Sequence, residues 1–410
     1  MTQQDSATAV EFPIPPAPTL YHPAPQLAQL RAHQPVAKVT LDDGTTGYLV
    51  TRYADVRQVL IDPRFSRAAA NAMGPGGAQT GVSMLAEDSM ISLDPPEHTR
   101  LRRLVAGAFT ARRVEQLRPK VRALVDELLA EVTARPHPVD LVEHFSLPLP
   151  VRVICELLGV PPQDQHIFHA WSDTVMSDAS RDPDEIRSTI VKLGEYFGKL
   201  IADKRATPAD DLMTALIAAR DEGDRLTEKE LLNLCFGLLI AGHETTANQI
   251  NMFLLTLMSF PEEYQRLAAS PELVPQAVEE LMRFVQLGDS SSNGLPRITT
   301  EAVELSGVTI PAGSVVLTSA LAANRDESVF SDPDRLDLSR EVAQHLSFGA
   351  GAHHCLGAQL ARMELQEALS GLLRHLPGLQ IAVPDSQLRF KSGMILRSLE
   401  TLPVTWQHEA

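Results

Sequence analysis

Cysteine and aromatic residues are both scarce in this sequence. Only three of its 410 residues are cysteine and 5% are aromatic. Cys155, Cys235 and Cys355 are far apart and odd in number, which argues against a disulfide framework and fits a reducing compartment. With so few aromatic side chains, leucine, valine and alanine must fill most of the core that a hydrophobic content of 44% supplies. We therefore expect a cytoplasmic protein with an aliphatic core.

Positive charge and long hydrophobic runs are limited as well. The 36 Lys and Arg residues face 52 Asp and Glu residues, giving a formal net charge of −16, which disfavours nucleic acid or an anionic membrane as a partner. The most apolar stretch, residues 231–242, is too short to span a membrane before His243-Glu244 interrupts it. Residues 1–18 lack the charged start and apolar centre of a signal peptide. The sequence predicts neither a nucleic-acid partner nor a membrane anchor.

The N-terminal part predicts an extended segment followed by a small sheet. The prolines between residues 13 and 25 favour an extended lead-in, placed at residues 1–25. Residues 36–41 and 46–51 alternate in polarity around Asp42-Asp43-Gly44, as in a β-hairpin. Similar alternation later in the chain predicts that residues 36–62, 297–320 and 388–406 form one β-rich edge.

Helical periodicity dominates the rest of the chain. Thr227-Glu228-Lys229-Glu230 is a capping box, and the helix that it starts could run to about Ser259, just before Pro261. This central helix would be roughly 48 Å long and apolar on all sides, so we expect it to be buried. The sequence predicts a mainly α protein with small β-sheet regions, in a single large domain over residues 26–410.

A single cysteine stands between a glycine-rich turn and a predicted helix. Phe348-Gly349-Ala350-Gly351-Ala352-His353-His354-Cys355-Leu356-Gly357 leads into the helical pattern Ala358–Leu373. The helix dipole and free N–H groups would stabilise a thiolate there, and glycines let the backbone approach a flat object closely. Such a thiolate suits an axial ligand of haem iron. On these residues alone, a buried structural cysteine, a phosphate-binding loop and a zinc site remain weaker alternatives.

A buried acid beside an alcohol interrupts the central helix. Within Ala241-Gly242-His243-Glu244-Thr245-Thr246, burial of Glu244 and Thr245 is costly unless each has a partner or a task. Thr245 could donate a hydrogen bond to the carbonyl four residues earlier and bend the helix.

Together these motifs resemble those of the cytochrome P-450 family, in its soluble bacterial class. Phe348-Gly-x-Gly-x-His353-x-Cys355-x-Gly357 is similar to the family's haem-binding signature, and the likeness runs from about Phe12 to the last predicted strand. The resemblance implies the cytochrome P-450 fold, with the central helix over haem b and Cys355 as the iron ligand. It implies that Ala241 and Gly242 leave room for haem and dioxygen, that Thr245 donates a hydrogen bond to dioxygen, and that Glu244 helps to deliver protons. The remaining haem contacts that it implies are Phe348, Gly349, His353 and Gly357.

The resemblance implies roles for two further groups of charged residues. His98 and Arg102 lie four apart on one predicted helix, and with Arg297 they match the family's ligands of the haem propionates. Glu280 and Arg283 match its Glu-x-x-Arg pair, with Arg335 as the third member of a buried structural network. On spacing alone, each would be an ordinary surface charge.

The resemblance also implies a substrate pocket under two lid helices, at about residues 164–177 and 183–204. The predicted substrate contacts are Val82, Leu85, Met90, Leu239, Ala241, Leu295, Met394 and Ile395. Arg102, Arg103, Arg112, Arg113 and Arg362 could form a basic surface for a ferredoxin or flavodoxin.

The activity implied is that of a monomeric haem-thiolate monooxygenase. It would insert one atom of O2 into an apolar, bulky specialised metabolite, by hydroxylation or epoxidation, with electrons from a separate ferredoxin or flavodoxin. Two alternatives stay open. One is a peroxide-driven peroxygenase or oxidative coupling enzyme of the same fold, and the other is a non-catalytic haem-binding or sensor protein.

Overall fold

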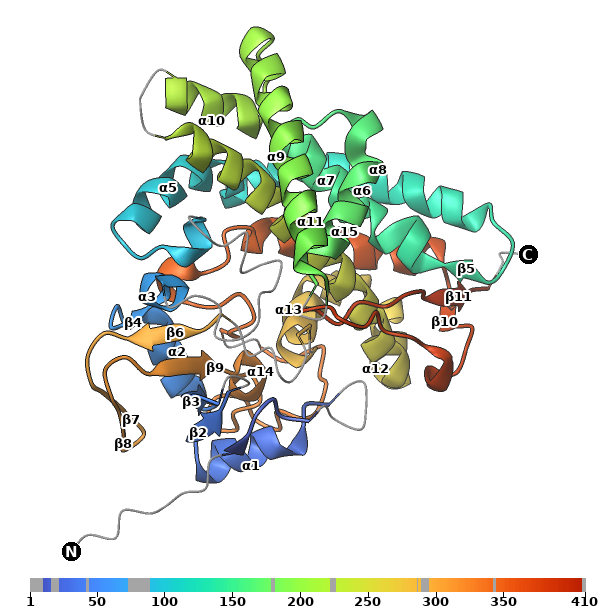
Figure 1. Ribbon diagram of the computed structural model, residues 1–410. Coiled ribbons are helices and arrows are strands. Elements are labelled where there is room, and N and C mark those ends of the chain that lie inside the picture. The colour runs from blue at the N-terminus through green and yellow to red at the C-terminus, as the bar shows by residue number, and fades with distance from the viewer. Residues whose placement is uncertain are drawn as a thin grey trace, which may run out of the picture.

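The computed structural model describes residues 10–15, 22–41, 44–72, 89–177, 181–221, 226–285, 287–288, 295–341 and 344–407. Helices dominate these ranges, and most of the long ones lie in the upper part of the molecule, while the main sheet lies in the lower part beside shorter helices (Figure 1). The predicted class, mainly α with small sheets, is confirmed.

The main sheet contains β1 (Val10–Glu11), β2 (Val36–Thr40), β3 (Thr46–Val50), β4 (Phe65–Ser66), β6 (Arg297–Thr299) and β9 (Val315–Thr318). Its strand order is β1-β2-β3-β9-β6-β4. The strands β2 and β3 form the predicted antiparallel hairpin, in which Val36 lies opposite Val50. The strand β1, inside the expected lead-in, pairs with β2 in parallel. The neighbouring helix α1 (Pro25–His33) buries Leu27 and Leu30 in one core with Val39 and Leu49 of the sheet.

The tail does not join this sheet, contrary to the sequence-based expectation. The strand β11 (Pro403–Thr405) pairs with β10 (Gln380–Ile381) and β5 (Val139–Asp140) in a separate three-stranded sheet. The alternation of residues 388–406 also predicts a β-hairpin, and one isolated bridge joins its two arms among the described residues, between Phe390 and Leu399. A separate two-stranded hairpin consists of β7 (Val303–Leu305) and β8 (Val308–Ile310). Alternating polarity identifies strand-forming residues, but it does not name their partners.

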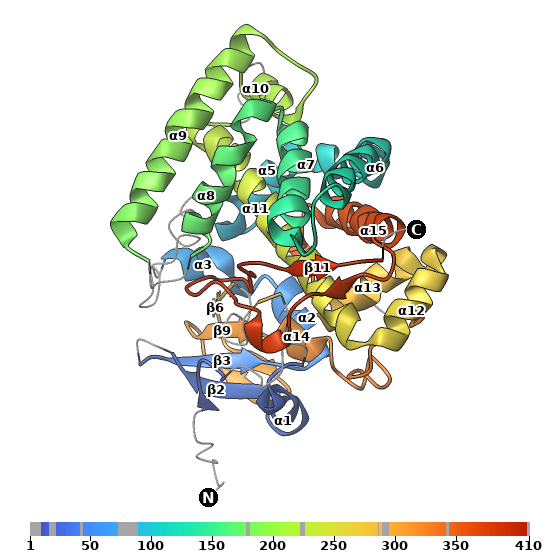
Figure 2. The ribbon, with the colours of Figure 1, turned by 90° about the vertical axis from the view of Figure 1, so that its right-hand side faces the viewer.

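The predicted central helix is α11, Glu228–Ser259. Its capping box is present: the N–H of Glu230 donates to Thr227 Oγ1 at 3.1 Å, and Glu230 Oε2 accepts the N–H of Thr227 at 2.8 Å. The helix packs against α7 (Pro148–Leu158) and α15 (Ala358–His375). Figure 2 shows it running through the middle of the helical part. The largest core surrounds it, so side chains on this helix are held from several directions.

The other helices wrap this centre and fix the elements of the site. Their bounds are α2 Tyr53–Ile61, α3 Arg67–Ala72, α5 Glu97–Ala106, α6 Ala111–Thr133, α8 Gln165–Val175, α9 Pro183–Ala206, α10 Leu212–Asp221, α12 Pro261–Ala269, α13 Val274–Phe284 and α14 Ala320–Ala323. Short 3₁₀ turns are η1 Met90–Ser92, η2 Gly107–Phe109, η4 Pro162–Asp164, η5 Pro271–Leu273, η6 Gly351–His353 and η7 Asp385–Gln387, and η3 Val142–Ser146 is a π-helical turn.

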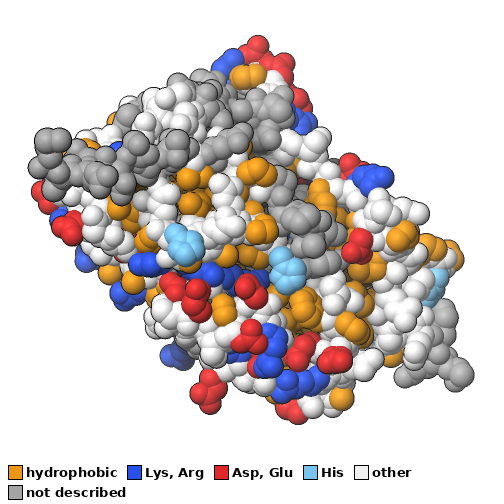
Figure 3. Space-filling view, turned by 90° about the horizontal axis from the view of Figure 1, so that it is seen from below, with side chains coloured by type: hydrophobic (Ala, Val, Ile, Leu, Met, Phe, Trp, Pro, Cys, Tyr) orange, Lys and Arg blue, Asp and Glu red, His pale blue; other side chains and the backbone are white. Residues whose placement is uncertain are grey.

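Charges of both signs share the lower face of the molecule. Lys and Arg side chains lie among Asp and Glu side chains on that face (Figure 3), so the net charge of −16 is not segregated there. Within the described ranges, every helix is too short or too polar to cross a bilayer.

Candidate active site

Cys355 is held between the turn at residues 348–351 and the start of α15. Its N–H donates to the Phe348 carbonyl at 2.8 Å, which closes the loop. Gly349 and Gly351 have φ values of 69° and 70°, in the left-handed region that favours glycine. A Cβ at Gly351 would lie 2.7 Å from the Leu60 carbonyl oxygen of α2. Gly351 is therefore needed for the packing of the loop against α2, whereas a Cβ at Gly357 would meet no atom within 4 Å.

The Cys355 side chain is exposed, whereas Cys155 and Cys235 are buried. Desolvation by the surrounding protein raises the pKa of the Cys355 thiol, and the Gly357 N–H, Arg102 and Arg362 lower it in part. The helix terminus alone therefore does not produce the stable thiolate that the sequence suggested. Coordination to a metal ion deprotonates a thiol outright, so this cysteine is a suitable iron ligand.

The middle of α11 presents an open position beside buried neighbours. Ala241 is exposed, although Ile240 and His243 are buried. Thr245 is half-buried and its Oγ1 donates to the Ala241 carbonyl at 2.9 Å, which confirms the predicted back-bond. An exposed alanine at the centre of a largely buried helix marks space beside it, and the Thr245 hydroxyl lies one turn further along.

Glu244 is only 2% exposed and lies next to a histidine that the sequence-based interpretation passed over. Its Oε1 is 3.4 Å from His243 Nε2, and Asn248 Nδ2 donates to the Glu244 carbonyl at 2.9 Å. His243 Nδ1 lies 2.8 Å from the Leu239 carbonyl oxygen and donates to it. His243 and Glu244 together can hold a proton near Thr245.

The structure assigns Gly242 a different role from the predicted one. We expected the missing side chain to leave room for dioxygen. A Cβ at Gly242 would instead lie 2.9 Å from Cδ1 and Cγ1 of Ile154, a residue of α7 that is 2% exposed. The glycine therefore allows α7 to pack closely against α11.

Replacing Gly242 by alanine should destabilise the protein by about 1–2 kcal/mol, because overpacking against Ile154 outweighs the gain in helix propensity. Gly237→Ala is the matched control, since a Cβ there meets nothing within 4 Å on the same helix. We expect Gly237→Ala to be neutral or stabilising by up to about 1 kcal/mol. Urea unfolding of both variants measures the difference, and equal stability would contradict the assigned contact.

Positively charged and imidazole groups gather in the space next to Cys355. His98 and Arg102 share a face of α5, and Arg102 Nη2 donates to the His354 carbonyl at 2.7 Å. The rings of His98 and His353 are 4.3 Å apart, and burial lowers the pKa of His353 to about 4. His98 Nδ1 and His353 Nε2 are buried without a hydrogen-bond partner among the described residues. Such orphaned groups indicate a missing polar ligand.

Two buried guanidinium groups complete this cluster. Arg297 and Arg67, the second of which the sequence-based interpretation missed, are each 5% exposed. Desolvation lowers the pKa of both to about 10. Asp94 is the acidic residue whose charge acts on both of them and on His98 and His353. This donor set fits the two carboxylates of haem, for which His98, Arg102 and Arg297 are the predicted ligands, and it includes His353, which is predicted only as a haem contact.

The buried network near α13 contains Arg340 in place of the predicted Arg335. Glu280 and Arg283 are fully buried and form an ion pair at 2.7 Å, as expected. The side chain of Arg335 is 63% exposed and pairs with Asp337. Arg340, 10% exposed, donates from Nε to Glu280 Oε1 at 3.1 Å. Arg335 contributes only its carbonyl oxygen, which accepts from Arg340 at 3.1 Å.

Apart from Ala241, which is exposed on α11, the predicted substrate contacts divide into three groups. Val82 and Leu85 lie outside the described residues. Met90, Leu295, Met394 and Ile395 are half-buried and therefore accessible to a ligand. Leu239 is fully buried in the main core, so it does not face an accessible space.

The predicted lid helices are α8 and α9, and the tail is tied to the end of α8. Lys391 Nζ lies 2.6 Å from Asp173 Oδ2, and the Ile395 N–H donates to the Met176 carbonyl at 3.1 Å. Met394 forms a bridge with Ser177. These contacts bring two predicted substrate residues next to the end of α8.

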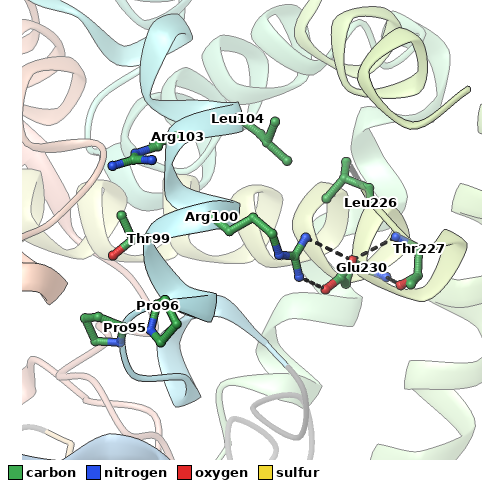
Figure 4. A pocket seen from close by; sticks show the side chains of 9 residues that line it. All are labelled: Pro95, Pro96, Thr99, Arg100, Arg103, Leu104, Leu226, Thr227 and Glu230. Carbon is green, nitrogen blue, oxygen red and sulfur yellow. Dashed lines mark hydrogen bonds and ion pairs between the residues drawn. The ribbon is translucent and has the colours of Figure 1, made fainter. Parts of the chain in front are cut away.

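A cavity of about 1170 Å³ separates α5 from the start of α11 (Figure 4). Arg100 of α5 reaches across it and pairs with Glu230 of the capping box. This ion pair joins the helix that carries His98 and Arg102 to the helix that carries Glu244 and Thr245.

Comparison with known proteins identifies the family. A family model described as cytochrome P450 matches residues 164–377. The mycinamicin IV hydroxylase/epoxidase of Micromonospora griseorubida is 48% identical over 93% of this chain and 95% of its own. The chain belongs to the cytochrome P450 family. The nocardicin C N-oxygenase of Nocardia uniformis subsp. tsuyamanensis, another relative of this P450, is also 48% identical, over 93% of this chain and 95% of its own.

The fold agrees with solved P450 structures. The crystal structure of HinD with NMFT and NO matches with a TM-score of 0.90 and 43% identity, covering 97% of this chain and 99% of that one. This P450 is therefore an oxidoreductase of the monooxygenase type, acting on a small molecule and O2 with thiolate-ligated haem iron.

Proposed function

We propose that this P450 uses haem b, bound through Cys355, to hydroxylate or epoxidise an apolar, bulky specialised metabolite. The observation that carries the proposal is the buried His243–Glu244 pair beside Thr245 on α11. A protein that only binds or senses a haem ligand has no need of a buried proton store next to an accessible hydroxyl. A monooxygenase requires protons at that position.

When bound, haem iron supplies the activation of dioxygen, and a thiolate ligand favours cleavage of the O–O bond. Cys355 would hold the iron, and Phe348, Gly349 and Gly357 would line the cofactor on the thiolate side. The Thr245 hydroxyl can turn from the Ala241 carbonyl towards the open space and donate a hydrogen bond there. Glu244 and His243 can replace the proton that it gives up, and Asn248 keeps the carbonyl of Glu244 satisfied.

An apolar substrate is supported by half-buried apolar side chains, two of which lie next to the end of α8. Leu295, Met394 and Ile395 are half-buried and apolar, and the tail contacts at Met176 and Ser177 hold two of them in place. The relatives are named for different compounds, mycinamicin IV and nocardicin C. They support a specialised metabolite as the class of substrate, but they do not identify the compound on which this P450 acts.

We assign electron delivery to a separate ferredoxin or flavodoxin that docks on the Cys355 side. A cavity of about 460 Å³ lies there, and Phe348, Gly349 and His354 form one wall of it. Arg57 lines the cavity and is exposed, and Arg112 and Arg113 at the start of α6 are exposed as well. Such charges can steer an acidic partner. Arg362 is already paired with Glu279 at 2.6 Å and Arg102 with the His354 carbonyl, so they contribute less.

The decisive test is the absorption spectrum of the dithionite-reduced protein under carbon monoxide. We expect a strongly red-shifted Soret band that is lost in Cys355→Ala, because only thiolate-ligated haem gives it. Cys155→Ala, which removes a buried thiol, is the control and should keep the band. A spectrum like that of a histidine-ligated globin, or an unchanged band in Cys355→Ala, would exclude Cys355 as the ligand.

A further inference from the structure

Arg67 connects three separate segments around the predicted haem edge. It is the first residue of α3, and its side chain is almost fully buried. Its Nε donates to the Ile91 carbonyl in η1 at 3.3 Å, and its Nη1 donates to the Pro296 carbonyl. Its backbone N–H donates to Asp94 Oδ1 at 2.9 Å. One residue thus bonds to the turn before α5, to Asp94 near the start of α5 and to the segment before β6.

The segments that Arg67 joins carry the predicted propionate ligands. Pro296 directly precedes Arg297, the first residue of β6, and β6 pairs with β4 immediately before Arg67. The Asp94 carbonyl accepts the N–H of His98 at 3.0 Å. A change in the position of the Arg67 side chain therefore acts on both Arg297 and His98. The hydrogen bonds place Arg67 as the common support of the two ligands.

Arg67 also adds positive charge that the protein itself does not neutralise. It lies close enough to Arg297 for the two charges to repel each other, and Asp94 is the acid that acts on both. The Asp94 carboxylate already accepts bonds from Ser66 Oγ at 2.5 Å and from the Arg67 N–H. Among the described residues, none accepts a hydrogen bond from Arg67 Nη2 or from the Arg297 guanidinium. Buried like charges are costly unless an anion joins them.

We propose that Arg67 is a further haem-anchoring residue, which positions Arg297 and His98 and pairs through Nη2 with a haem carboxylate. The proposal rests on the proposed haem-thiolate function and on the haem site next to Cys355. Arg67 then contributes to haem binding in two ways, by holding Arg297 and His98 in position and by its positive charge. Arginine suits this double task, because its planar fork can bond two carbonyls and still offer a donor to an anion.

The test compares Arg67→Met and Arg67→Lys with Arg64→Met in the holoenzyme. Arg64 is three residues away, on the surface, and pairs with Asp62, which makes it a matched control. The first measurement is the rate of ferric haem transfer to excess apomyoglobin. We expect Arg67→Met to lose haem about 10-fold faster or more, since a charge-assisted bond and its support are both removed. Arg64→Met should match the wild type.

The second measurement is the midpoint potential of the iron. It distinguishes the effect of the positive charge of Arg67 from its effect on the positions of Arg297 and His98. Removing a cation near the haem should lower the potential in Arg67→Met, whereas Arg67→Lys keeps the charge and should stay close to the wild type. If Arg67→Met does not fold, Arg67→Lys still carries the test, because lysine cannot bond two carbonyls and an anion in the same geometry and should lose haem several-fold faster.

Two results would overturn the proposal. One is haem loss from both Arg67 variants at the rate of Arg64→Met. The other is faster haem loss from both variants with no difference in potential, which would leave Arg67 a support without a charge contact. Neither result bears on the carbon monoxide spectrum, so a failure of the proposed haem-thiolate function would be seen separately in the wild type.

Discussion

Replacing Glu280 by glutamine should destabilise this P450 by about 3–5 kcal/mol, the cost of leaving a buried charge without its partner. Glu280 is fully buried and its carboxylate accepts bonds from Nε and Nη2 of Arg283, at 2.7 and 2.8 Å, and from Arg340 at 3.1 Å. It also accepts the N–H of Asp337 at 3.1 Å. Glutamine keeps the shape of the side chain but removes the negative charge. Arg283, itself fully buried, would then lack a counter-charge.

The measurement is the free energy of unfolding in urea, followed by far-UV circular dichroism, with two arginine variants beside Glu280→Gln. Arg340→Met should cost about 2 kcal/mol, because it removes a bond to a charged acceptor and several to carbonyls. Arg335→Met should cost less than about 1 kcal/mol, because its side chain is exposed. If Arg335→Met were the more damaging of the two, the assignment of Arg340 as the third member of the network would be wrong.

Sequence motifs predicted correctly the features that depend on neighbours along the chain. The capping box at Thr227, the hairpin of β2 and β3 and the back-bond of Thr245 each involve residues within a few positions of one another. For such features, the residue types and their spacing are sufficient to predict the local geometry. The turn before Cys355 belongs to the same class, since its glycines sit where the backbone needs positive φ.

The errors at Arg335, Gly242 and the tail concern contacts between distant segments. Arg335 and Arg340 are five residues apart, and only the folded path of the loop decides which one reaches Glu280. The family resemblance implies that Gly242 leaves room for a ligand, but the missing Cβ faces Ile154, 88 positions earlier in the chain. The tail alternates as predicted, yet it pairs with β5 and β10. Spacing carries no information on such partners.

The role of Arg67 could not be predicted from the sequence for the same reason, because it depends on contacts with distant segments. Its local sequence, Phe65-Ser66-Arg67-Ala68, contains no signal that separates a buried arginine from an exposed one. Its importance follows from carbonyls at Ile91 and Pro296, which lie in two other parts of the chain. The family motifs gave the propionate ligands on α5 and β6, and the structure was needed to find what connects them.

Replacing Thr245 by alanine should uncouple electron use from product formation. The hydroxyl is the donor at the accessible centre of α11, and Glu244 and His243 beside it are buried. Without it, protons reach dioxygen by less ordered routes, so electrons should appear mainly in hydrogen peroxide. We expect product formed per electron pair to fall about 10-fold or more, within the range by which positioned proton donors accelerate reactions.

The experiment measures electron-donor oxidation, hydrogen peroxide and product together, with ferredoxin as the donor and a substrate found by its spin-state shift. Thr246→Ala is the matched control, because Thr246 is 4% exposed and its hydroxyl bonds back to the Gly242 carbonyl at 3.4 Å, away from the open position. Its coupling should remain near that of the wild type. Loss of coupling in both variants would point to a distorted helix rather than to the Thr245 hydroxyl.

The same variant distinguishes the monooxygenase from a peroxide-driven enzyme of the same fold. Hydrogen peroxide already carries the two electrons that ferredoxin would deliver and the two protons that the Thr245 route would supply, so peroxide-driven turnover should survive in Thr245→Ala. A protein whose turnover with ferredoxin is negligible, and whose peroxide-driven turnover is high in both wild type and variant, would be a peroxygenase. If coupling with ferredoxin is unchanged in Thr245→Ala, protons reach dioxygen by another path, and the role assigned to this hydroxyl is wrong.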